Sequence, residues 1–274
     1  MDIIPNEMGG LLFNAAFGFY AVALFHSGAA FLSKRELFFR IAIISVWIAF
    51  GFHTGFLIYR GFEESFFPLI GLRESLAFFA WTVSLCFLLA NLRYRIRALG
   101  VFLLPLVAVL MLSTMFIKSS PIPEILRNSW VYLHSTFLFL AYGMFFLTFI
   151  ASVIYLLQER QLKSKKPSDS FYQLPSLGTL DDLFFKFLIS GFVFMSLGLL
   201  VGIIWAEREW VNGWHGDPKV ISALIMWVIY LVLIYLRVTV GWRGRRAAFI
   251  SMLGFVSIIF TFLVVSYFGS QHTF

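Results

Sequence analysis

Long apolar runs, separated by short polar connectors, follow one another along almost the whole chain. A helix needs about 20 apolar residues to cross the hydrocarbon core of a bilayer. Eight runs come close to this length. They are Leu11–Leu32, Phe38–Tyr59, Ser75–Leu92, Leu99–Ile117, Trp130–Leu157, Leu183–Trp205, Val220–Arg237 and Ala247–Phe268. The pattern predicts an all-α, polytopic integral membrane protein with about eight transmembrane helices.

Composition agrees with a membrane protein. Of the 274 residues, 60% are hydrophobic and 13% are charged, which is more apolar surface than a soluble core of this size can bury. The net charge of +7 comes from short basic clusters between apolar runs, so we discount nucleic-acid binding. Cys86 is the single cysteine, which excludes a Cys-x-x-Cys redox pair within the chain, a thiolate metal cluster and a Cys-x-x-Cys-His haem-attachment site.

The basic clusters occupy every second connector, and such clusters face the cytoplasm. They comprise Lys34, Arg35 and Arg40, then Arg93, Arg95 and Arg97, then Arg160, Lys163, Lys165 and Lys166, and finally Arg237, Arg243, Arg245 and Arg246. Both termini are therefore predicted outside the cell membrane, together with the connector between the sixth and seventh runs. The start MDIIPNE is acidic, so we expect the first run to be retained rather than cleaved as a signal peptide. We predict a single membrane domain over residues 1–274.

The connector between the sixth and seventh runs has an unusual composition. We call Trp205–Lys219, which reads WAEREWVNGWHGDPK, the Trp-rich connector. It holds three tryptophans, one histidine, an Asp-Pro pair and mixed charges. Tryptophan also collects at membrane boundaries, so an interfacial aromatic belt is the alternative to a functional surface.

Three of the five histidines are predicted on the outer side. His134 lies in the first turn or so of the fifth run, His272 follows the eighth, and His215 lies in the Trp-rich connector. His53 lies about 9 Å inside the second run and His26 about 23 Å inside the first, at 1.5 Å per residue. An ionisable side chain in hydrocarbon costs at least about 2.5 kcal/mol, so each is a functional candidate, the alternative being a hydrogen bond to a neighbouring helix. The difference of about 14 Å indicates that they do not ligate one iron together.

His134 and His272 suit the two axial positions of a haem iron. Tryptophan rings can pack on a porphyrin, and Arg208, Lys219 or Arg127 can pair with its propionates. A zinc site remains an alternative, because Glu207, Glu209 and Asp217 could contribute ligands.

These residues carry a family resemblance. The run IWAEREWVNGWHGDPKVISALIMW and the terminal SQHTF resemble the haem-handling core of the cytochrome c assembly family of CcsA/ResC type, which has a tryptophan-rich WWD motif flanked by two outer histidines. GFHTGFLIYRGFEESFFPLIGLRESLAFFAW is similar to the family's transmembrane histidine and its Glu-Ser-Leu signature. The resemblance covers about residues 47–274. By this resemblance, His134 and His272 match the outer histidines, His53 the transmembrane one, and Trp205, Trp210, Trp214, Asp217, Pro218 and Lys219 the tryptophan segment.

The chain also departs from the family pattern. Gly216 stands where the family usually has a tryptophan before the aspartate, Val220 replaces a glutamate and Ser222 replaces another tryptophan. In these departures and in its short length, the chain resembles the HemX-type branch of the superfamily. That branch is linked to control of haem synthesis through glutamyl-tRNA reductase.

The resemblance implies that the protein binds a b-type haem transiently and presents it at the outer face for attachment to apocytochrome c. It implies a subunit of a membrane cytochrome c synthase (haem lyase) complex, completed by a second assembly protein of CcsB/ResB type. Haem is expected to enter near His53, whose other axial ligand would come from that partner. The alternatives are a HemX-type regulator acting through the loop Glu159–Asp182, and a secondary transporter, for which we find no internal repeat.

Overall fold

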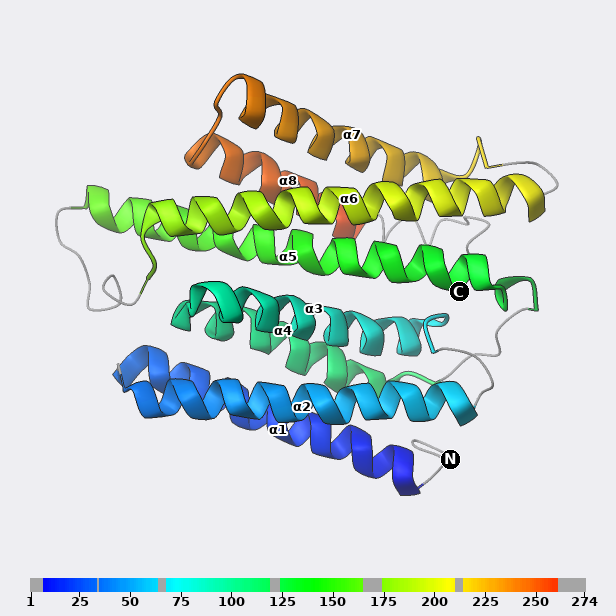
Figure 1. Cartoon of the computed structure of the whole chain (residues 1–274), viewed down its shortest axis with the longest axis horizontal. Helices are drawn as coiled ribbons and strands as arrows, with labels where there is room; N and C mark the ends of the chain where they lie inside the picture. The colour runs from blue at the N-terminus through cyan, green and yellow to red at the C-terminus, as the bar shows by residue number, and fades with distance from the viewer. Residues whose placement is uncertain are drawn as a thin grey trace. The chain divides into compact units, whose positions relative to one another are not determined.

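A computed structural model describes residues 7–33, 35–63, 68–118, 124–164, 174–209 and 214–260. Within these ranges the regular structure is helical throughout (Figure 1). The helices are α1 (Glu7–Ser33), α2 (Glu36–Glu63), α3 (Leu72–Tyr94), α4 (Arg97–Phe116), the short 3₁₀ helix η1 (Glu124–Leu126), α5 (Ser129–Lys163), α6 (Leu177–Glu209), α7 (Pro218–Thr239) and α8 (Arg245–Phe260).

Seven of these helices, α1 to α7, are long and apolar enough to cross a membrane by length and composition. The polytopic, all-helical fold predicted from the apolar runs is thereby confirmed. The described part of α8 has 16 residues, and the rest of the predicted eighth run lies outside the described residues. Helix α5 continues past the predicted end at Leu157 to Lys163, because Gln, Glu, Arg and Lys are polar but still favour a helix.

The chain divides into two compact units. Unit 1 comprises Met1–Pro121 and Arg160–Ser176, and unit 2 comprises Ile122–Glu159 and Leu177–Phe274. Each unit is described by itself below, and the single membrane domain stays a prediction.

Unit 1 is built on a close pairing of α1 with α2, and α4 also packs against α1. Ala16, Ala23 and Ala30 recur every seven residues on α1 and are at most 1% exposed. Ala42 and Ala49 are buried on α2 in the same way. Small side chains let two helix backbones approach closely in a membrane, so these buried alanines agree with the close packing of α1 and α2.

In unit 2, α6 presents glycines to α5. A Cβ added at Gly191 would lie 2.8 Å from the ring of Phe145, and one added at Gly198 would lie 2.7 Å from Leu138. Phe145 in turn stacks on Tyr230 of α7, with ring centroids 3.8 Å apart. The glycines therefore allow large side chains of α5 to lie directly on the α6 backbone, and they fix how the two helices align.

Candidate functional site

His134, in the second turn of α5, lies against α6. Its Nδ1 is 2.7 Å from the carbonyl oxygen of Gly198. A carbonyl only accepts hydrogen bonds, so Nδ1 carries the proton and donates it. In the neutral ring, the lone pair that can coordinate a metal is then on Nε2.

The imidazole also lies over Gly202, one turn further along α6. A Cβ at position 202 would come closer than 3.0 Å to Nδ1 and Cε1 of His134. The absence of a side chain at Gly202 therefore makes the room that the imidazole occupies.

The end of α6 meets the beginning of α5 beside this histidine. The guanidinium of Arg208 lies 5.6 Å from the ring centroid of Trp130, a cation–π distance, and Arg208 is exposed. Figure 1 shows the N-terminus of α5, the C-terminus of α6 and the N-terminus of α7 at the same end of unit 2. Trp205 belongs to this end too, but its side chain is buried, with 5% exposure. Its role against a porphyrin face stays a prediction.

Within the Trp-rich connector, residues 205–209 form the end of α6, and the description resumes at Trp214. The rings of Trp214 and His215 stack with centroids 4.2 Å apart, and His215 is exposed. Trp210 and His272, both predicted site residues, lie outside the described residues. The predicted pairing of His134 with His272 is therefore not tested by the geometry.

Asp217 has a clear structural task. Its Oδ1 accepts hydrogen bonds from the backbone N–H of Lys219 at 2.8 Å and of Val220 at 3.1 Å, which makes it the N-cap of α7. Pro218 occupies the first helical position, where its missing N–H is harmless. Lys219 is half-buried in that first turn. An Asp-Pro pair before an apolar run is a helix-start signal, so this role could have been predicted from the sequence.

His53 is fully enclosed in unit 1. Its exposure is 0%, its Nδ1 lies 3.4 Å from the hydroxyl of Tyr20 on α1, and the two rings meet edge to face. This is the arrangement of a histidine bonded to a neighbouring helix. Iron ligation by His53 stays a prediction, and it requires the surrounding helices to part. His26, by contrast, bonds within its own helix, with Nδ1 2.8 Å from the Val22 carbonyl oxygen.

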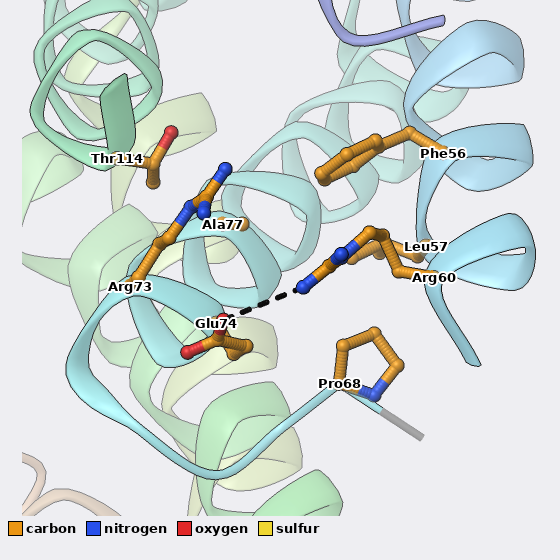
Figure 2. A pocket seen from close by; sticks show the side chains of 8 residues that line it. All are labelled: Phe56, Leu57, Arg60, Pro68, Arg73, Glu74, Ala77 and Thr114. Atoms are coloured by element: carbon orange, nitrogen blue, oxygen red, sulfur yellow. Dashed lines mark ion pairs between the residues drawn. The ribbon is translucent and has the colours of Figure 1, made fainter. Parts of the chain in front are cut away.

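A charged pocket, which the sequence analysis missed, lies two turns from His53. Figure 2 shows Arg60 of α2 extended toward Glu74 of α3, with Arg73 on the opposite side of the pocket. Arg60 is 3.0 Å from Glu63 and 4.0 Å from Glu74, and both Arg60 and Glu74 are buried. The remaining lining residues are Phe56, Leu57, Pro68, Ala77 and Thr114. The pocket has room for about one water molecule and is far too small for a porphyrin.

A second buried ion pair lies in unit 2, at the end opposite His134. Arg237 of α7 makes a forked contact with Asp181 of α6, at 2.9 Å and 2.7 Å, and it is 7% exposed. The Asp181 carboxylate also accepts from the backbone N–H of Gly244 at 3.3 Å. One carboxylate thus joins α6, α7 and the turn that leads into α8.

The residues at the outer-predicted end of unit 2 fit haem by their chemistry. His134 supplies an imidazole whose tautomer is fixed by the protein, and Arg208 supplies an exposed guanidinium at the same end. For zinc, the described parts of the chain contain no group of three or more His, Cys, Asp or Glu side chains that could hold a metal ion. The zinc alternative therefore has no support from the described residues.

Comparisons with known proteins identify the family to which the chain is similar. The model of a family described as "Cytochrome C assembly protein" matches residues 69–272. "Cytochrome c biogenesis protein CcsA" of Trieres chinensis is 28% identical over 301 residues, covering 98% of this chain and 96% of the relative. The protein of the same name from Heterosigma akashiwo is 30% identical over 251 residues, covering 78% of each chain. That of Gloeobacter violaceus is 28% identical and covers 94% of this chain and 93% of its own.

A solved structure shares the fold. The chain is similar to "Cytochrome c Heme Lyase CcmF" with a TM-score of 0.69 and 17% sequence identity, over 93% of this chain. The match covers 46% of the CcmF chain, so this chain spans just under half of that protein. At this identity the likeness shows the fold alone.

Proposed function

This chain belongs to the cytochrome c assembly protein family, and on that premise we propose that it holds haem at the outer face of the membrane for attachment to apocytochrome c. It is a multi-pass membrane protein of cytochrome c maturation. The cofactor in this proposal is a b-type haem, bound transiently, which the imidazoles of His134 and His272 would hold.

The observation that carries the proposal is the hydrogen bond from His134 Nδ1 to the Gly198 carbonyl. Histidines that ligate metals commonly donate their second ring N–H to a backbone carbonyl or a carboxylate, which fixes the ring and raises its basicity. His134 has this arrangement, so Nε2 is the ring nitrogen that would coordinate the iron.

The neighbouring residues would orient the porphyrin. Arg208, exposed at the end of α6, would pair with a propionate through its forked donors. Trp205, Trp210 and Trp214 would contribute aromatic surface, and Lys219 a second cation. Asp217 would act by fixing the start of α7, and so one end of the Trp-rich connector.

When bound, haem supplies the vinyl groups to which the cysteines of an apocytochrome add. The chain itself would bind the haem, orient it and leave its vinyl groups accessible. Proteins usually contribute binding and orientation where a cofactor carries the chemistry. His134 and His272 would hold the haem until it passes to the apocytochrome. A second assembly protein of CcsB/ResB type would complete the synthase.

The proposal is tested by following covalently bound haem in cells. We expect cells that lack this chain to lose c-type cytochromes, detected by haem-dependent peroxidase staining of denaturing gels. Wild-type chain should restore the staining, and His134→Ala should not. Unchanged staining in the deletion strain would refute the proposal. A changed abundance of glutamyl-tRNA reductase in that strain, with c-type cytochromes intact, would favour the regulatory alternative.

A further inference from the structure

The imidazole of His134 lies between two glycines of one helix. Gly198 and Gly202 are four residues apart on α6, so they lie on the same face, one turn apart. The first offers its carbonyl oxygen to Nδ1 at 2.7 Å, and the second leaves the space that the ring fills.

Helix geometry connects these two contacts. Every Cα–Cβ bond in a helix tilts toward the N-terminus, so a side chain at 202 would project back over the carbonyl at 198. A Cβ placed there would meet Nδ1 and Cε1 of His134 inside van der Waals distance. The carbonyl keeps a second lone pair after accepting its own helical hydrogen bond, and that lone pair can serve the imidazole only while position 202 is empty.

We propose that Gly198 and Gly202 are positioning residues for the haem ligand: together they hold His134 in the Nδ1–H tautomer and present Nε2 as the coordinating nitrogen. The inference rests on the proposed function and adds what sets the ligand in place. It predicts that the ligand is preorganised before haem arrives. A partner of this kind typically changes metal affinity by about 10- to 100-fold when it is lost.

His26 gives the appropriate contrast. Its Nδ1 also contacts a carbonyl oxygen, that of Val22 at 2.8 Å, but four residues back on its own helix. That contact needs no neighbouring helix and no glycine. Substitutions on α6 should therefore change the spectrum of His134 and leave that of His26 unaltered.

The test is nitrogen NMR of ¹⁵N-histidine-labelled full-length protein, purified without haem, with His134 assigned by its absence from His134→Ala. We expect a protonated Nδ1 and an unprotonated Nε2 at His134. Gly202→Ala should abolish this single tautomer and weaken haem binding by about 10- to 100-fold. An Nε2–H tautomer in the wild-type protein would overturn the inference, and so would an unaltered tautomer in Gly202→Ala.

Gly191→Ala is the matched control, because its added methyl meets Phe145 at 2.8 Å in the same helix pair but far from His134. Equal loss of haem in Gly191→Ala and Gly202→Ala would show a packing effect and contradict positioning. If Gly202→Ala does not fold, the wild-type spectrum still tests the inference, because an Nε2–H tautomer at His134 would overturn it. A different result would separate this inference from the proposed function. If the wild-type protein has the predicted tautomer but His134→Ala binds haem as well as the wild type, the positioning of the ring is supported and the proposed haem site is refuted.

Discussion

At the scale of the residue, two adjacent aspartates of α6 have very different surroundings. Asp181 pairs with Arg237, and the two side chains are 20% and 6% exposed. Asp182 pairs with Lys186 of the next turn, at 49% and 52% exposure. Neutralising the partner of a buried charge leaves that charge without compensation, whereas exposed pairs contribute little.

We therefore expect Asp181→Ala to lower the free energy of unfolding by about 3 kcal/mol, since breaking a buried pair costs about 3–5 kcal/mol and Asp181 keeps some exposure. Asp182→Ala should change it by less than about 1 kcal/mol. Unfolding in mixed detergent micelles, followed by circular dichroism, measures both. Similar losses in the two variants would mean that the Asp181–Arg237 pair does not stabilise unit 2.

The sequence predicts His134 as a site residue but does not reveal which of its ring nitrogens carries the proton. The choice of ring nitrogen depends on the Gly198 carbonyl, 64 residues away along the chain. Backbone carbonyls carry no sequence signal, and a glycine in an apolar run looks like any other small residue. The charged pocket of Arg60, Arg73 and Glu74 is not predictable for a related reason, because its residues lie at the edges of two separate apolar runs.

At the scale of the element, the first turn of α7 depends on one side chain. Asp217 satisfies two backbone N–H groups that have no partner within the helix. Asp217→Ala should cost about 1 kcal/mol of stability, while Asp217→Asn should retain most of it, because asparagine caps helices equally well. The unfolding free energies of both variants give the measurement.

The same pair of variants separates capping from a direct role at haem. If Asp217 acts only through the start of α7, Asp217→Asn should keep wild-type haem content. Loss of haem from Asp217→Asn at unchanged stability would show that the negative charge itself is needed at the site.

Helix positions were largely predictable, because the hydrocarbon core imposes a length that the apolar runs display directly. The ends of the helices were less predictable. Helix α5, for example, extends through Glu159 and Arg160 to Lys163. Which helices pair was not predictable from hydropathy. It depends on small residues within uniformly apolar sequence, such as the glycines of α6, on which side chains of α5 lie directly.

At the scale of the whole molecule, membrane orientation is the prediction that rests on charge alone. The alternating basic connectors predict that the Trp-rich connector faces outward and that the turn between α3 and α4 faces the cytoplasm. In a Cys86→Ser background, a membrane-impermeant thiol reagent applied to intact cells should label His215→Cys and spare Arg93→Cys. Both positions are exposed, so burial does not limit either reaction. The opposite labelling would reverse the topology.

The central claim, an outer haem site made by two histidines, is tested most directly by the visible absorption spectrum of detergent-purified protein, oxidised and reduced. We predict a low-spin bis-histidine spectrum in the wild type and in the control His26→Ala, whose ring bonds within its own helix. The spectrum should be lost or weakened in His134→Ala and in His272→Ala. Undiminished haem in both of these variants would contradict the account.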